Sequence, residues 1–264
     1  MIAYPIDNFH IVKDNILRFD GDGEFYMVLV LKRRKDTKGK IVEGVNEDNR
    51  LIKHYFVYDK EYLDKKTNAI MTLCEQNNAR AYIFPQRRSC RLVLWSLHAK
   101  VSDTLKDGAM NVHFDHLIRS CVAGKHETEK KCHKRWLIDI DEDDAETLIA
   151  AKAWRGRHYD PVSDNFVVRH YSEWIAHKIR CALVLRDGER GDDAKDFMPK
   201  IGGNYLESDI TVLPTPHGFH IVTPPFNRDN KAMEKYFGVG CPSTDWIKPD
   251  AMALLYASAI GEDD

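Results

Sequence analysis

The first part of the chain alternates short apolar runs with amphipathic segments. The run EFYMVLVLKRRKD, residues 24–36, is rich in β-branched and aromatic residues and ends in a basic cluster, and HYFVYD, residues 54–59, has the same character. Gly, Asn and Asp residues between the two runs indicate a turn. The pattern therefore predicts an antiparallel pair of strands, and ARAYIF, residues 79–84, predicts a further strand.

Two helices are predicted in the same region. The first begins at Lys60 and closes at EQNN, residues 75–78, because apolar positions recur between them at helical spacing: Tyr62, Leu63, Ala69, Ile70, Leu73 and Cys74. Ser89 is a candidate N-cap of the second helix, which fades at KDGAMN, residues 106–111. The apolar face of this second helix is expected to include Leu92, Trp95, Leu97 and Ala99.

The middle of the chain is more polar. A cationic connector, residues 120–135, precedes the strand WLIDID, residues 136–141, and DAETLIAAKAW, residues 144–154, predicts a helix. Residues 155–208 hold many Gly, Asp and Arg residues around one helical segment. We expect an insertion or an exposed subdomain there.

The last part of the chain returns to β-rich runs. DITVLPTPHGFHIVTPPFN, residues 209–227, has two such runs around a Pro and Gly turn and predicts a hairpin. NKAMEKYFG, residues 230–238, predicts a short helix, and ALLYAS, residues 253–258, is a late apolar segment. Strands and helices of unequal length favour an α+β or α/β domain over a solenoid.

Length and composition set the scale of the protein. With 264 residues, of which 43% are hydrophobic, the chain is long enough to bury a sizeable core. We expect a single catalytic unit over residues 1–264, with one lobe at about 1–120 and another at about 130–264 that contains the polar insertion.

Charge and cysteine content exclude little. Thirty-nine Lys and Arg residues stand against 41 Asp and Glu residues, a net charge of −2, so any contact with nucleic acid has to depend on local patches. The six cysteines are widely spread, the N-terminus lacks a basic and apolar leader, and no apolar run approaches the ~20 residues of a membrane span. We therefore expect a soluble, cytoplasmic protein with reduced thiols.

Asp139 and Asp141 stand at alternate positions of a predicted strand. Side chains on a strand alternate faces, so the two carboxylates lie on the same side, about 6 to 7 Å apart. Such a pair repels unless a cation lies between the acids, and it can hold a divalent metal ion. In the alternative interpretation Asp139 ends the strand, and DEDD, residues 141–144, is the solvated start of the next helix.

Two further polar residues follow at a distance. His220 comes directly after Gly218 and Phe219 on a predicted strand, and a glycine permits close approach of a ligand. A lone His on an apolar strand is more often a satisfied core residue than a ligand. Asp245, after a Ser-Thr turn, supplies a third carboxylate.

These residues resemble a known family. LIDID (137–141), GFHIV (218–222) and STDWIK (243–248) are similar, in order and style, to the three motifs of the archaeo-eukaryotic primase, or primase-polymerase, superfamily. Those motifs are hydrophobic-Asp-hydrophobic-Asp, small-x-His and hydrophobic-Asp. The chain resembles the small stand-alone catalytic cores of phage and mobile-element type within this superfamily, and the combination of motifs is more specific than any single motif.

The resemblance implies a fold and a set of roles. Asp139, Asp141 and Asp245 would bind two divalent metal ions, Mg²⁺ or Mn²⁺, and His220 would contact the phosphates of the incoming nucleotide; these four form the implied catalytic set. The implied fold is a two-lobed α+β core. It has an N-terminal α/β lobe with phosphate-binding arginines and a C-terminal RRM-like antiparallel sheet that carries the acids.

The chain departs from the family pattern in three respects. Thr244, not an apolar residue, precedes Asp245, and Asp250 is an alternative third acid. The gap between the first and second motifs is long, which the polar insertion would explain. TPH, residues 215–217, also fits small-x-His, so His217 competes with His220 for the phosphate-binding role.

Basic residues outside the motifs extend the resemblance more loosely. NNARAYIFPQRRS, residues 77–89, places Arg80, Arg87 and Arg88 at a strand-helix junction. Arg87 and Arg88, together with Lys248, are candidate ligands of triphosphate or template backbone. The alternative is an ordinary solvated helix start at RRS.

A zinc site is a further candidate. Cys121, His126, Cys132 and His133 give the spacing C-x4-H-x5-C-H. Because the last two ligands are adjacent in sequence, a tetrahedral site is awkward, and unmodified thiols are the preferred interpretation.

The sequence thus predicts a metal-dependent, template-directed nucleotidyltransferase, a DNA primase-polymerase that initiates or extends primers on single-stranded DNA with NTP or dNTP. The alternatives are a non-catalytic nucleic-acid-binding module and a metal-dependent nuclease or phosphodiesterase. The chain carries no Walker, GxSxG or GxGxxG motif, so a replicative helicase would be a separate partner. By resemblance alone, the setting is phage or mobile-element replication in a bacterial or phage-infected host cell.

Overall fold

The computed structural model describes residues 5–20, 23–33, 50–106, 114–123, 134–141, 209–225, 246–248 and 251–258. Within these residues the fold is α+β, as the sequence predicts. The chain divides into two compact units, Met1–Lys134 with Leu255–Asp264, and Arg135–Leu254. Among the helices of the described residues, none has the length and apolar content needed to cross a bilayer.

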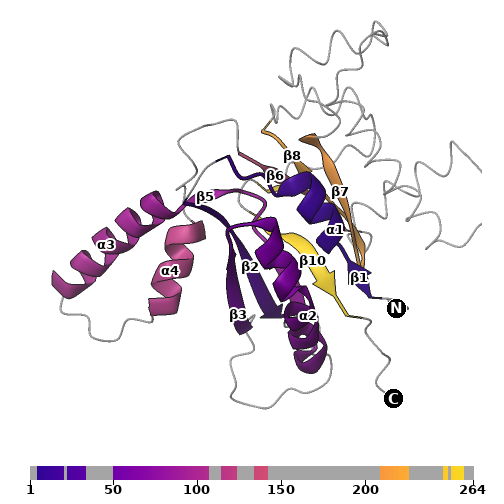
Figure 1. Cartoon of the computed structure of the whole chain (residues 1–264), viewed down its shortest axis with the longest axis horizontal. Coiled ribbons are helices and arrows are strands. Elements are labelled where there is room, and N and C mark those ends of the chain that lie inside the picture. Colours follow the sequence, from indigo (N-terminus) through magenta and orange to yellow (C-terminus); the bar gives the residue numbers. More distant parts are fainter. Residues whose placement is uncertain are drawn as a thin grey trace, which may run out of the picture. The chain divides into compact units, whose positions relative to one another are not determined.

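The first unit is built on a six-stranded sheet in which β2 pairs with three other strands, β3, β4 and β5 (Figure 1). Its strands lie in the order β1-β10-β4-β2-β3, and β5 pairs with the start of β2. The bounds are β1 (Ile6–Asp7), β2 (Glu24–Lys32), β3 (Arg50–Val57), β4 (Arg80–Ile83), β5 (Arg88–Ser89) and β10 (Ala253–Ala257). β2 is antiparallel to β3 and to β4, which confirms the predicted strand pair and the predicted third strand.

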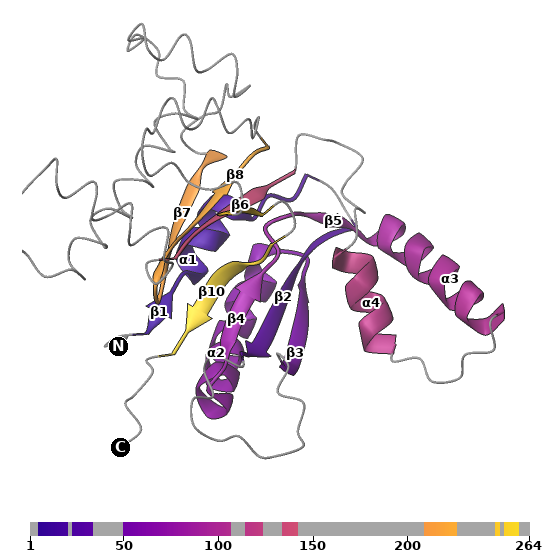
Figure 2. The same ribbon diagram turned by 180° about the vertical axis from the view of Figure 1, so that it is seen from behind.

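The core of the first unit forms around β2 and β4. Every residue of β4, and residues 25–30 of β2, are buried, because these strands have a neighbour on each edge and are covered by side chains. The helix α2 (Lys60–Asn77) lies along the sheet (Figure 2), where it contacts β2, β3 and β4 and buries Leu63, Ile70 and Cys74. Near the N-terminus, α1 (Phe9–Ile11) continues into the π-helix η1 (Val12–Ile16), which buries Val12 and Ile16.

The ends of α2 have clear local causes. At its start, the side chain of Asp59 accepts a hydrogen bond from the backbone N of Tyr62, an N-cap that satisfies one of the first free amides. At its end, Asn78 adopts the left-handed conformation with φ 46°, and its N–H bonds back to the last turn. The predicted helix start at Lys60 is confirmed.

The helices α3 (Cys90–Lys106) and α4 (Phe114–Ala123) pack against each other. Ser89 Oγ accepts a long hydrogen bond, 3.5 Å, from the backbone N of Leu92, as expected of an N-cap. The predicted apolar face of α3 is partly wrong, because two of its residues, Trp95 (70%) and Ala99, are exposed, whereas Val93, which the prediction leaves out, is buried. α4 also occupies the first residues of the predicted polar connector, down to Ala123.

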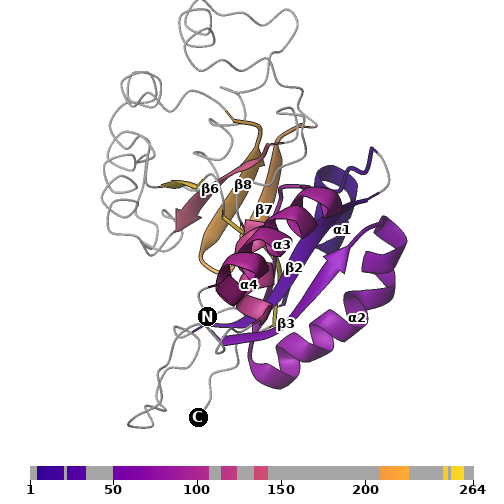
Figure 3. The ribbon, with the colours of Figure 1, turned by 90° about the vertical axis from the view of Figure 1, so that its left-hand side faces the viewer.

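The second unit contains a four-stranded antiparallel sheet in the order β7-β8-β6-β9 (Figure 3 shows β6, β7 and β8). Its strands are β6 (Trp136–Asp141), β7 (Thr211–Thr215), β8 (Gly218–Thr223) and β9 (Ile247–Lys248). The predicted hairpin is confirmed, since β7 and β8 pair from Thr215 and Gly218 outward. The predicted helices at 144–154 and 230–238 and the insertion at 155–208 lie outside the described residues.

Candidate functional site

The register of β6 and β8 sets the geometry of the candidate site. Asp139 lies opposite His220, and Asp141 lies opposite Gly218. Because strand side chains alternate, both acids and His220 are on the same face of the sheet. Ile138 and Ile140 are on the other face, and both are fully buried, which holds the strand in place.

His220 is fixed on both sides of its ring. Its Nδ1 accepts a 2.9 Å hydrogen bond from the backbone N of Leu254, so the ring proton is assigned to Nε2. Nε2 in turn donates to Oδ1 of Asp139 at 3.1 Å. His220 is 8% exposed, and in this geometry its Nε2–H orients the carboxylate.

The second oxygen of Asp139 has a cationic partner. In β9, Lys248 pairs with Leu137, two residues before Asp139 on the same face, and its Nζ donates to Oδ2 of Asp139. Burial raises the pKa of Asp139, but the hydrogen bonds from His220 and Lys248, together with the positive charge of Lys248, outweigh it and hold that pKa below its ordinary value. Asp139 is therefore ionised and has a different partner on each oxygen.

This arrangement has the donor chemistry for a hard divalent cation. Carboxylate oxygens are the preferred ligands of Mg²⁺ and Mn²⁺, and one oxygen of Asp139 already holds a cation, the lysine ammonium. The exposed Asp141 supplies a second carboxylate on the same face of β6. Among the described residues no group of three or more His, Cys, Asp or Glu forms a complete metal site, and Asp245 and Asp250 lie outside those residues.

His217 occupies a different position from His220. It lies in the two-residue turn between β7 and β8, next to Gly218, and therefore beside the Asp141 end of β6 in the register of the sheet. Of the two histidines that fit the family motif, His220 is the one placed opposite Asp139.

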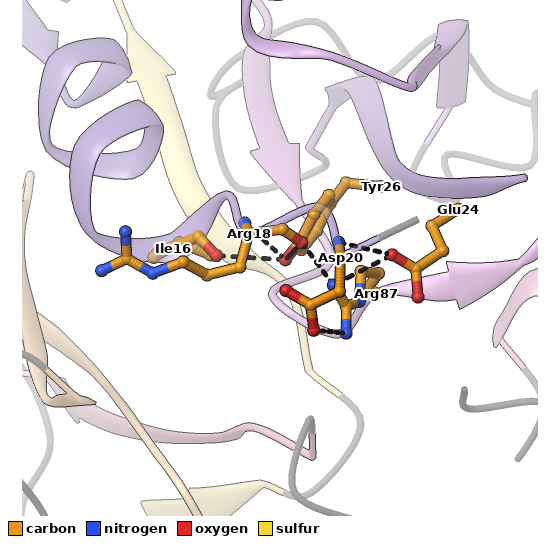
Figure 4. Close-up of polar contacts among 6 residues, drawn as sticks. All are labelled: Ile16, Arg18, Asp20, Glu24, Tyr26 and Arg87. Carbon is orange, nitrogen blue, oxygen red and sulfur yellow. Dashed lines mark hydrogen bonds and ion pairs between the residues drawn. The ribbon is translucent and has the colours of Figure 1, made fainter. Parts of the chain in front are cut away.

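Arg87 and Arg88 are interior residues of the first unit. The Arg87 side chain is 2% exposed and forms ion pairs with Asp20 (2.8 Å) and Glu24 (2.9 Å), while its Nη1 also donates to the carbonyl oxygen of Arg18 at 2.9 Å (Figure 4). Arg88 is fully buried, and its Nη1 donates to Oε1 of Gln86 at 3.2 Å. The alternative of a solvated helix start is therefore wrong for both.

The contacts of Arg87 organise the chain before β2. The Tyr26 hydroxyl accepts from the backbone N of Arg18 at 3.1 Å and lies 3.1 Å from the carbonyl oxygen of Ile16, beside the Arg87 contacts (Figure 4). Since two carboxylates already neutralise Arg87, its first role in this structure is to fix this segment. Phosphate binding by Arg87 or Arg88 stays a prediction.

The zinc candidate is described only at its first residue. Cys121 on α4 is buried and carries a free thiol, whereas His126, Cys132 and His133 lie outside the described residues. The zinc site stays a prediction.

Sequence reasoning missed two relationships: the ion pair between Lys248 and Asp139, and the carboxylate partners of Arg87. The register of β9 against β6 creates the first, and a two-residue strand leaves too weak a pattern to show it. In comparisons with protein-family models, curated proteins and solved structures, nothing matches this chain.

Proposed function

We propose that this protein is a metal-dependent, template-directed nucleotidyltransferase of the primase-polymerase type, which initiates or extends primers on single-stranded DNA. One observation carries the proposal. The strand with Asp139 and Asp141 pairs with the strand of Gly218 and His220 in a register that sets Asp139 opposite His220. Two motifs separated by a long stretch of sequence are thereby neighbours on one face of a sheet.

In this proposal the acids, the histidine and the lysine have different tasks. Asp139 and Asp141 bind Mg²⁺ or Mn²⁺, with Asp245 as the third ligand. When bound, the metal ions lower the pKa of the primer 3′-hydroxyl and neutralise charge on the leaving pyrophosphate. His220 holds Oδ1 of Asp139 in a fixed direction, since its own ring is anchored by the amide of Leu254. Lys248, whose side chain is 47% exposed, is better suited to bind phosphate than the buried Arg87.

A primer-extension assay tests the proposal. The full chain is incubated with Mn²⁺, labelled dNTPs or NTPs and single-stranded DNA, with and without a primer. We expect products that grow with time, and we expect Asp139→Asn to lower the rate by at least about a hundredfold, because the substitution removes the charge but keeps the shape. Asp103→Asn on α3 is the matched control, since this carboxylate is 73% exposed and lies 3.7 Å from the exposed Lys106 ammonium.

Two other results of this assay would favour the alternative functions. Shortening of the template, abolished by Asp139→Asn, would replace the polymerase with a nuclease that uses the same carboxylates. Binding of single-stranded DNA without any change in its length would leave a nucleic-acid-binding module. Either result overturns the proposal.

A further inference from the structure

We propose that Lys248 is an exchangeable counter-ion of Asp139: a divalent cation displaces the lysine ammonium from Oδ2, and the released ammonium then binds the phosphates of the nucleotide. The inference rests on the proposed function, since it concerns the same carboxylate. It adds an order of events, in which Lys248 pairs with Oδ2 of Asp139 before the metal ion binds, and metal binding then frees the lysine ammonium for phosphate.

The two partners of Asp139 differ in how firmly they are held. His220 is nearly inaccessible, and its other ring nitrogen is bound to the backbone of Leu254. Lys248 belongs to a strand of two residues, its side chain is 47% exposed, and four rotatable bonds carry its ammonium. The contact with His220 is therefore the permanent one, and the contact with Lys248 is the one that can be replaced.

Exchange at Oδ2 is favoured by charge. The Lys248 side chain is the exposed end of this ion pair, at 47%, so its ammonium recovers its hydration when it leaves the carboxylate. A divalent cation has twice the charge of the ammonium and can also use the neighbouring carboxylate of Asp141, which lies on the same face. The protein therefore loses little when the lysine leaves and gains a stronger interaction.

Exchange also changes what the site attracts. While Lys248 is paired with Asp139, the two charges cancel, so the pair attracts neither a metal ion nor a phosphate strongly. After exchange, the ammonium has no carboxylate partner at this position, and it stands close to the metal site, where a triphosphate would place its negative charge. Metal and nucleotide binding are then coupled, and the coupling is reciprocal.

Mn²⁺ binding to the full chain, measured by electron paramagnetic resonance without nucleotide, tests this directly. Lys248→Met removes the competing cation, so we expect Mn²⁺ to bind roughly three to ten times more tightly. Lys248→Arg keeps the charge and offers a bidentate contact to the carboxylate, so we expect unchanged or weaker Mn²⁺ binding. Lys106→Met on α3 is the matched control, an exposed lysine beside an aspartate, and should change nothing.

A second readout follows the lysine itself. Acylation of Lys248 by an amine-reactive ester, mapped by mass spectrometry, should rise several-fold when Mn²⁺ is added to the wild type, while acylation of Lys106 should stay constant. In Asp139→Asn the lysine has already lost its partner, so Mn²⁺ should leave its acylation unchanged.

The outcomes separate the two proposals. If Asp139→Asn binds Mn²⁺ as tightly as the wild type, the metal site itself is wrong and the proposed function fails. If Asp139→Asn weakens Mn²⁺ binding but Lys248→Met does not tighten it, or acylation of Lys248 does not respond to Mn²⁺, the exchange alone is refuted. A folding defect is distinguished because it would weaken Mn²⁺ binding in both Lys248 variants.

Discussion

The hydroxyl of Tyr256 donates a 2.9 Å hydrogen bond to Oε1 of Glu75, so that β10 is linked by a side chain to the last turn of α2. The Tyr256 side chain is almost fully buried. Burial, together with the hydrogen bond to the negative charge of Glu75, raises the pKa of Tyr256 to about 12. The link therefore requires the protonated phenol.

Tyr256→Phe tests this link. The substitution should lower the free energy of unfolding at pH 7 by about 1 kcal/mol, the usual worth of one hydrogen bond. Because the folded pKa is raised, the stabilisation is complete below pH ~10 and is lost as pH rises towards 12. Urea unfolding of both proteins from pH 7 to 11.5 should show the difference shrinking at high pH. A difference that grows with pH would contradict this explanation.

Arg87 is expected to be a major source of stability in the first unit. Arg87→Met leaves Glu24 and Asp20 close together without their cation, and we expect a loss of about 2 to 4 kcal/mol in urea unfolding. Asp20→Asn should cost less than ~1 kcal/mol, because its side chain is 52% exposed and well hydrated. Equal losses in the two variants would mean that burial of Arg87 does not determine the effect.

The inward side of α3 can be checked with two neighbouring substitutions. Val93→Ala removes buried methyl groups and should lower the melting temperature, with a cost of about 1 to 3 kcal/mol. Trp95→Ala, at a side chain that is 70% exposed, should change stability by less than ~0.5 kcal/mol despite the larger deletion. If Trp95→Ala lowered stability more than Val93→Ala, the side of α3 that carries Trp95 would be the packed one, as the sequence predicts.

Asp139 should make the second unit sensitive to acid when metal is absent. Its pKa is lowered in the folded state by the hydrogen bonds of His220 and Lys248, so its contribution is present above the unfolded pKa of about 3.9 and is lost as pH falls below it. With chelator present, the stability of the wild type should fall more steeply between pH 5 and 3 than that of Asp139→Asn. Parallel pH profiles would show that these contacts do not stabilise the carboxylate.

Local sequence patterns predicted much of the fold. The long apolar run of β2, the capped start of α2 and the hairpin of β7 and β8 are each encoded by neighbouring residues, and all are confirmed. The face of α3 was predicted less well because its apolar residues lie on more than one side of the helix, and spacing alone does not show which side packs against α4. That choice is made by tertiary contacts.

The candidate site was predicted in part, for a similar reason. The alternation in β6 placed Asp139 and Asp141 on one face, and the structure sets His220 opposite Asp139. The pairing of Lys248 with Asp139 depends on which residue of a two-residue strand faces β6, and no local pattern specifies it. Likewise, the ion pairs of Arg87 join residues far apart in the sequence, so no local pattern specifies them. For this reason the sequence alone left a solvated helix start open, whereas Arg87 and Arg88 are interior residues.

The position of β10 in the first sheet has a consequence for synthesis of the protein. β10 lies between β1 and β4, and Ile6 pairs with Ala257, so among the described residues the first strand pairs with the last one. During translation β4, β2 and β3 are available long before the strand that continues their sheet. Until then the edge of β4 is open to wrong partners, and a chain truncated before residue 253 would lack the strand that joins β1 to β4.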